Sequence, residues 1–275
     1  MTIKEIIKKY QLAANKKLGQ NFLLDNNIAI KICNSCLIDR NTTVIEIGPG
    51  LGSLTRVLLT KAKRVLAFEI DKVLADILQT EMPDDKLQVI NQDFLKVNLG
   101  EYLRNDDNKL VVCANLPYYI TTAILFKLFE DPLAIEEILV MMQKEVAERF
   151  GAKVGTKQYG SLSLLAQFRY RVDIIMKVKR QAFYPVPNVD STVVAFRRKT
   201  PEGNIDGELL FGLIKSCFQY RRKTIYNNYR QRVGETVAKK NLAAAGIAAN
   251  NRAEQLTLTD FLRLYQAENE EKMSR

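Results

Sequence analysis

The chain has 275 residues with no histidine and no tryptophan, and its 41 Lys and Arg against 31 Asp and Glu give a formal net charge of +10. An apolar share of 47% can fill a folded core, which excludes wholesale disorder. The lack of histidine excludes Ser-His-Asp and Cys-His catalysis and any zinc site with an imidazole ligand. The charge favours an anionic partner, although a merely basic protein is the simpler alternative.

The first half of the chain alternates apolar runs with helical patterns, after a predicted helix at 26–38. Strands are predicted at 44–47, 64–70, 87–93, 109–119 and 136–143, with helices between them at 53–62, 71–80 and 121–131. Ser53 is the expected N-cap of the helix at 53–62. This alternation predicts an α/β fold, a Rossmann-like parallel sheet with helices on both faces.

The pattern changes after residue 150. A polar loop at 151–160 precedes a helix at 161–170, and two further strands are expected at 171–178 and 191–198. Beyond the linker-like Thr200–Gly203 only helical patterns remain, at 206–219, 234–246 and 257–266. We therefore expect a catalytic domain at 1–201 and a small all-helical domain at 202–275.

The cysteines and the N-terminus indicate the compartment. Cys33 and Cys36 form a C-x-x-C pair, but no second pair and no histidine could complete a tetrahedral metal site. We expect no metal, and reduced, buried thiols. No apolar run of 18 residues and no secretory signal pattern occur, so we expect a cytoplasmic protein without a membrane partner.

A glycine-rich loop, Gly48-Pro49-Gly50-Leu51-Gly52, follows the first strand and precedes a helix, as in nucleotide-binding folds. Glu69 ends the second strand, where a carboxylate can bind the hydroxyls of a ribose. The loop is G-x-G-x-G and not the dinucleotide G-x-G-x-x-G, which favours S-adenosylmethionine over a nicotinamide dinucleotide. Asp93, after the third strand, is expected to bind the adenine amine of the cofactor.

The most specific signal is Asn115-Leu116-Pro117-Tyr118 at the end of the fourth strand. The amino nitrogen of adenine is a poor nucleophile, and two acceptors that hold its hydrogens can aim its lone pair. The Asn115 side-chain oxygen and the Leu116 carbonyl can supply them, while Pro117 stiffens the turn. Tyr118 can stack on the base. This methyl transfer needs no strong general base, in agreement with the absence of histidine.

The chain resembles the ribosomal RNA adenine dimethyltransferase family, and within it the KsgA (RsmA) type that modifies small-subunit RNA. The motifs that carry the resemblance span nearly the whole chain: LGQNFLLD (18–25), VIEIGPGLGSLT (44–55), FEID (68–71), NQDFL (91–95), NLPYYITT (115–122), MMQKEVAERF (141–150), YGSLSLLAQ (159–167), FYPVPNVDSTVV (183–194) and RRKTIYNN (221–228). Ala123 departs from the pattern, where proline is expected after NLPYxxT.

The resemblance implies dimethylation of two adjacent adenosines in a hairpin loop near the 3′ end of small-subunit ribosomal RNA, during ribosome biogenesis. It implies S-adenosylmethionine as donor, the immature small subunit as partner and a monomeric enzyme. The implied cofactor-binding residues are Asn21, Leu23, Gly48, Glu69, Asp93 and Asn115, with Gly50 added from the glycine loop. The residues implied to hold the target adenine are Asn115, Leu116, Pro117 and Tyr118, with Phe183 over the other face of the base.

A basic segment is the expected RNA-binding surface. The stretch 209–234 contains no acidic residue and holds Arg221, Arg222 and Lys223, which are the predicted RNA-binding residues. Further basic and aromatic side chains were expected to contribute: Lys16, Lys17, Arg197, Arg198, Lys199, Lys215, Arg230, Arg232, Tyr220, Tyr226 and Tyr229. A solvated basic helix face is the simpler alternative.

Three other functions are compatible with parts of this sequence. A large-subunit adenine methyltransferase of the macrolide-resistance type shares the cofactor and the Asn-Leu-Pro-Tyr motif, but RRKTIYNN and the long C-terminal part favour the small-subunit type. A mainly noncatalytic ribosome-assembly factor on the same fold is disfavoured by the intact Glu69 and Asn115. A nicotinamide-dependent oxidoreductase is disfavoured by the spacing of the glycine loop.

Overall fold

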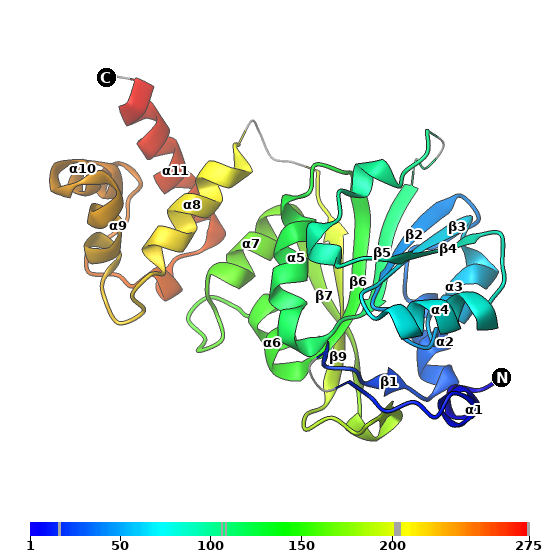
Figure 1. Cartoon of the computed structure of the whole chain (residues 1–275). Helices are drawn as coiled ribbons and strands as arrows, with labels where there is room; N and C mark the ends of the chain where they lie inside the picture. The colour runs from blue at the N-terminus through cyan, green and yellow to red at the C-terminus, as the bar shows by residue number, and fades with distance from the viewer. Residues whose placement is uncertain (16–17, 106, 108, 201–204, 274–275) are drawn as a thin grey trace. The chain divides into compact units, whose positions relative to one another are not determined.

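The computed structural model describes residues 1–15, 18–105, 107, 109–200 and 205–273 (Figure 1). The chain forms two compact units, the first of Met1–Ala147 with Val172–Arg198 and the second of Glu148–Arg171 with Lys199–Arg275. The expected boundary at 201/202 lies outside the described residues. Glu148–Arg171, which we expected in the first domain, groups with the C-terminal helices because Tyr159 and Leu164 belong to their core.

The first unit is built on a seven-stranded sheet of order β4-β3-β2-β5-β6-β9-β7 (Figure 1). The strands are β2 (Thr42–Ile47), β3 (Arg64–Glu69), β4 (Leu87–Asn91), β5 (Lys109–Asn115), β6 (Ile135–Gln143), β7 (Tyr170–Val178) and β9 (Ser191–Arg198). The strands from β4 to β6 are parallel, and β9 is antiparallel to β6. The predicted parallel arrangement is confirmed for β2 to β6. The central strands β2 and β3 are buried along their whole length, as expected for parallel strands covered by helices on both faces.

Alternation along β9 shows the two covered faces. Ala195 packs in a cluster that includes residues of α2 (Asn26–Asn34) and α3 (Thr55–Lys61). The next residue, Phe196, points to the opposite face, where its ring lies 5.2 Å from that of Phe129 in α5 (Thr121–Glu130). Successive side chains of a strand point to opposite faces, so the sheet is enclosed on both sides.

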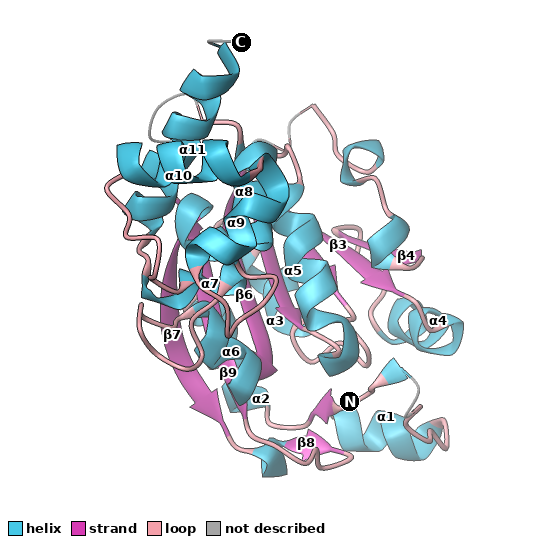
Figure 2. Cartoon of the chain, turned by 90° about the vertical axis from the view of Figure 1, so that its left-hand side faces the viewer, coloured by secondary structure: helices cyan, strands magenta, loops and turns pink. Residues whose placement is uncertain are grey.

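The remaining elements of the first unit are short or lie at its edge. Helix α4 (Lys72–Glu81) is capped by Asp71, whose carboxylate accepts from the backbone N–H groups of Val73 and Leu74. Strands β1 (Phe22–Leu23) and β8 (Phe183–Tyr184) pair antiparallel in a separate two-stranded sheet (Figure 2). The other helices are α1 (Ile3–Lys9) and α6 (Lys144–Phe150), the latter crossing the unit boundary, with 3-10 turns at Phe94–Lys96, Leu99–Glu101, Tyr118–Ile120 and Arg180–Ala182.

The second unit is helical, as the sequence predicts for its C-terminal part. Its helices are α7 (Ser161–Arg169), α8 (Gly207–Cys217), α9 (Ile225–Val233), α10 (Glu235–Ala244) and α11 (Leu258–Met273), with a 3-10 turn at Ala253–Gln255. Leu210, Ile214, Tyr229, Leu242 and Phe261 are buried in one shared core. Each helix contributes an apolar stripe to it, which is how short helices gain stability that they lack alone.

Candidate active site

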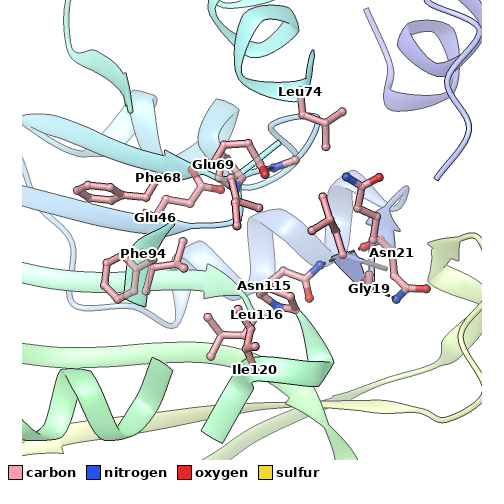
Figure 3. Close-up of a pocket in the computed structure, with 18 of the residues that line it drawn as sticks. Gly19, Asn21, Glu46, Phe68, Glu69, Leu74, Phe94, Asn115, Leu116 and Ile120 are labelled. Atoms are coloured by element: carbon pink, nitrogen blue, oxygen red, sulfur yellow. Dashed lines mark hydrogen bonds between the residues drawn. The ribbon is translucent and has the colours of Figure 1, made fainter. Parts of the chain in front are cut away.

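A cavity lies at the carboxyl ends of the parallel strands (Figure 3). The strand order reverses between β2 and β5 at this point, and open α/β sheets bind their ligands at such a crevice. Its lining residues are 18–23, 46–51, 53–54, 68–70, 74, 92–94, 115–120 and 124. The structure thus brings together nearly all the predicted site residues: Asn21, Leu23, Gly48, Gly50, Glu69, Asp93, Asn115, Leu116, Pro117 and Tyr118.

The glycine loop approaches its neighbours closely. Gly50 has φ of +57°, and a Cβ placed there would lie 3.3 Å from the Phe22 ring. The prediction that Ser53 caps the following helix is wrong. Helix α3 begins at Thr55 without a side-chain cap, and the Ser53 hydroxyl donates instead to the Leu23 carbonyl at 2.6 Å.

The N-terminal segment 18–23 forms one wall of the cavity. The Gln20 side-chain amide donates to the Asp71 carboxylate at 2.8 Å, which ties the segment to the N-terminus of α4. Together with the bond from Ser53, this fixes the segment beside the glycine loop. The sequence alone predicts no role for Gln20, because nothing local in it links this residue to Asp71, which is 51 positions away.

Glu69 is buried, with 5% of its surface exposed, and both its oxygens accept backbone hydrogen bonds. The N–H of Gly50 donates to Oε2 and the N–H of Asp71 donates to Oε1, each at 3.0 Å. Burial raises the pKa of Glu69, while these two N–H groups act in the opposite direction. Each oxygen keeps a second lone pair, so the carboxylate can still accept from ligand hydroxyls.

Asn115 ends β5 with its side chain in the cavity wall (Figure 3). Its amide nitrogen donates to the carbonyl oxygen of Asn21 at 3.3 Å. Its Oδ1 is buried and has no hydrogen-bond partner among the described residues. A buried acceptor without a partner is costly, which indicates that a ligand donor completes it.

The turn after Asn115 is held by its backbone. The Leu116 N–H donates to the Met141 carbonyl at 3.0 Å, and the Pro117 carbonyl accepts from the Thr121 hydroxyl at 2.9 Å. The half-buried Tyr118 places its hydroxyl 2.6 Å from that of Ser191. The four residues of the motif are therefore fixed in the cavity wall before any ligand arrives.

A comparison with known protein families identifies the reaction that this cavity serves. The family model described as "Ribosomal RNA adenine dimethylase" matches residues 11–270. The chain belongs to the ribosomal RNA adenine dimethylase family. It is an rRNA adenine dimethyltransferase, and its methyl donor is S-adenosylmethionine.

Known proteins similar to this dimethylase share its length and fold. Proteins named "Ribosomal RNA small subunit methyltransferase A" from Staphylococcus haemolyticus and Staphylococcus aureus are 44% and 46% identical to it, over 96% of this chain and 93% of theirs. A dimethyladenosine transferase from Plasmodium falciparum has the same fold, with a TM-score of 0.76 and 24% identity over 90% of this chain and 97% of its own. The 23S rRNA methyltransferase ErmE gives a TM-score of 0.69 and 26% identity, over 90% of this chain and 99% of its own.

The cavity of the dimethylase fits its methyl donor. S-adenosylmethionine carries a ribose and an adenine but no phosphate, so it requires acceptors and close backbone approach and no cluster of cations. Glu69 supplies a buried carboxylate, and the glycine loop supplies the close approach. Asp93 lines the cavity and uses one oxygen to cap the turn Phe94–Lys96, accepting from Leu95 N at 3.0 Å. Within the described residues its second oxygen accepts no protein hydrogen bond, so it can accept from a ligand.

Phe183 lies apart from the other predicted residues of the cavity. Its ring is 1% exposed in the core of the first unit and does not line the cavity. The pairing of β8 with β1 places Phe183 opposite Leu23 and turns it inward, while the next residue, Tyr184, is 44% exposed. Its contact with the target adenine stays a prediction.

Glu46 lines the cavity of the enzyme and was missed by sequence reasoning (Figure 3). Only 1% of it is exposed, and its Oε2 has no hydrogen-bond partner within the described part of the chain. Burial raises the pKa of Glu46 to about 8, with the Glu69 carboxylate adding to the shift. The sequence signal that could have found it is a carboxylate inside the predicted strand at 44–47, whose other residues are apolar.

The predicted RNA-binding residues lie in the second unit and have different surroundings. The Arg221 guanidinium pairs with Glu254 at 3.0 Å and donates to the Lys157 carbonyl, so it ties segments of the unit together. Arg222 is exposed, and the Lys223 ammonium lies 4.6 Å from the Tyr220 ring centroid.

Two residues of the basic segment bind one buried carboxylate. Tyr229 is fully buried and its hydroxyl donates to Glu268 at 3.0 Å, so its expected place on an RNA-binding surface is wrong. Arg232 pairs with the same carboxylate at 3.1 Å but remains exposed, so its part in RNA binding stays a prediction. Lys16 and Lys17, also expected near the RNA, lie outside the described residues.

Other expectations concern metals, thiols and membranes. All four cysteines are buried and free of disulfides, as predicted. Among the residues with described placement, no group of three or more Cys, Asp or Glu side chains is arranged to hold a metal ion. No helix in the described ranges is long and apolar enough to cross a membrane.

Proposed function

We propose that this chain transfers methyl groups from S-adenosylmethionine to the exocyclic amines of two adjacent adenosines in a hairpin loop near the 3′ end of small-subunit ribosomal RNA. The observation that carries the proposal is the buried, unpartnered Oδ1 of Asn115 beside the cofactor cavity. The small-subunit target is supported by relatives of that name at 44–46% identity over 96% of the chain, against 26% for the large-subunit enzyme ErmE.

The residues that would hold the cofactor divide by chemistry. The Glu69 carboxylate accepts from the ribose hydroxyls, Asp93 accepts from the adenine amine, and the glycine loop at Gly48 and Gly50 lets the ligand approach the backbone. Asn21 and Leu23 close the N-terminal side of the cavity. When bound, S-adenosylmethionine supplies an electrophilic methyl group on a sulfonium.

The residues that would hold the target base are those of the turn after β5. Asn115 Oδ1 and the Leu116 carbonyl accept the two amino hydrogens, which directs the nitrogen lone pair at the methyl group. Tyr118 stacks on the base and contributes roughly 1–3 kcal/mol, the range for stacking on single-stranded bases. The methylated nitrogen is acidic and loses its proton to water, so no histidine is required.

The partner is the immature small subunit, bound by a monomeric enzyme in the cytoplasm. A target adenosine must leave its stack to reach a cavity of this kind, and hairpin loops lower the cost of doing so. Arg222 and Lys223 supply charge for phosphate contacts, while Arg221 supports the surface that carries them. The domain of 202–275 is then the RNA- and ribosome-binding part of the chain.

Methyl transfer from tritiated S-adenosylmethionine tests the proposal. Immature small subunits, naked small-subunit RNA and large-subunit RNA serve as substrates, and Asn115→Ala is compared with the wild type. We expect label in small-subunit RNA and a large loss in Asn115→Ala with unchanged thermal stability. Equal labelling by the variant would refute the mechanism, and label in large-subunit RNA alone would refute the target.

A further inference from the structure

Tyr118 is held by the backbone of the turn that carries it and by its phenol oxygen. At the backbone end, the carbonyl of the preceding Pro117 accepts from the Thr121 hydroxyl and from the Ile120 N–H. At the far end, the phenol oxygen lies 2.6 Å from the hydroxyl of Ser191, which is 73 positions away in the sequence. Ser191 is fully buried, so water does not reach its hydroxyl to take the place of the phenol when the bond opens.

Ser191 stands on a rigid support. It is the first residue of β9 and pairs with Gln143 of β6. The carbonyl of the preceding Asp190 accepts from the Lys144 N–H at 3.1 Å, and the Asp190 carboxylate accepts from the Arg180 N–H at 3.0 Å. The position of the hydroxyl is therefore set by the sheet and the turn before it.

The geometry of the tyrosine side chain determines how this hydrogen bond restricts the ring. The phenol oxygen lies on the axis through Cβ and the ring, so a bond at that oxygen fixes the direction of the axis. The bond leaves rotation about that axis, and a half-turn about it exchanges two equivalent faces of the ring. Without the bond, the ring can move to another χ1 rotamer and leave the place where a base would stack.

We propose that Ser191 is a positioning residue, whose hydroxyl holds the Tyr118 ring in the place where it stacks on the target adenine. This proposal rests on the proposed function, in which Tyr118 contacts the base. A ring fixed in advance reduces the ordering cost when the flipped base enters. Burial raises the pKa of Tyr118, so the phenol stays protonated at neutral pH and can share its proton with Ser191.

A double-mutant cycle on the rate of RNA methylation tests this inference. Ser191→Ala and Tyr118→Phe each remove one partner of the bond while the aromatic ring is retained. We expect each to lower kcat/KM for RNA roughly three- to tenfold, in line with one lost hydrogen bond, and the double variant to be no worse than either. Ser191→Thr, which keeps the hydroxyl, should restore most of the rate.

Matched measurements separate positioning from general damage. Thr192→Val alters the adjacent residue of β9 and should leave the rate unchanged, and the affinity for S-adenosylmethionine should be unchanged in every variant. Losses that add in the double variant, or wild-type activity in Ser191→Ala, would overturn the positioning role. A wild-type enzyme that labels no small-subunit RNA would instead overturn the proposed function, so the two failures are distinguishable.

Discussion

Glu46 should make the stability of the ligand-free enzyme depend on pH. Burial raises the pKa of this carboxyl from 4.5 to about 8, so the folded chain retains a proton that the unfolded chain has released. Stability therefore falls as the pH rises from about 4.5 to about 8. At about 1.4 kcal/mol per pH unit, the free energy of unfolding loses on the order of 4–5 kcal/mol over this range.

The perturbation that isolates this effect is Glu46→Gln, which keeps the shape and removes the titration. Urea unfolding of both proteins at several pH values from 4.5 to 8.5 gives the difference in free energy of unfolding. We expect the free energy of unfolding of the variant to increase relative to that of the wild type as the pH rises, by about 3 kcal/mol or more at pH 8.5.

The control is Glu137→Gln, a buried carboxylate that has partners. Glu137 is fully buried but accepts from the Arg197 guanidinium at 2.9 Å and from the Leu37 N–H at 2.6 Å. Its substitution breaks an ion pair and should destabilise the protein at neutral pH. A difference between wild type and Glu46→Gln that stays constant within 1 kcal/mol across the range would refute the reasoning.

Two further predictions concern the glycine loop and the basic segment. A Cβ at Gly52, where φ is +78°, would lie 2.0 Å from the terminal methyl of Met82 and 2.7 Å from Cδ1 of Leu78, and both side chains are buried and must repack. With the backbone strain, Gly52→Ala should cost about 2–4 kcal/mol in urea unfolding. Gly155→Ala, with φ of +81° and no atom within 4 Å, should cost only about 1–2 kcal/mol, and equal losses would contradict the steric argument. Reversing Arg222 and Lys223 to Glu should weaken RNA binding and flatten its salt dependence, measured by filter binding, and unchanged binding across salt would exclude this surface. Adding Arg221→Glu should also lower the melting temperature, because that side chain pairs with Glu254.

The sheet could be predicted because its strands leave a local pattern. Continuous apolar runs located β2 to β6 within a few residues, the largest error being the end of β5 at Asn115 instead of residue 119. The pairing of β1 with β8 could not be predicted, because two-residue strands have no periodicity and their partners are some 160 positions apart. Helix α9 was not predicted as a separate element, since its sequence is polar apart from a few buried side chains.

Site residues could be predicted where they stand at the end of a recognisable strand. They could not be predicted where their contacts come from segments distant in the sequence. Glu69 and Asn115 follow strands, and parallel strands bring their carboxyl ends to one edge. The burial of Phe183 could not be predicted, because an aromatic residue fits a core as well as a base and the register with Leu23 turns this one inward. Glu46, Gln20 and Ser191 gain their roles from neighbours distant in sequence, which no local pattern reveals.

The N-terminal wall and the base-binding turn share one hydrogen bond, and this bond orients Asn115. The Asn21 carbonyl can only accept, so it selects the amide nitrogen of Asn115 as its partner and leaves Oδ1 toward the cavity. An amide in the opposite orientation would place two oxygens 3.3 Å apart and present a donor to the amino group of the target. In the function proposed above, the segment that closes the cofactor cavity thus also sets the acceptor for the target base, so the site aims an amino group without a histidine.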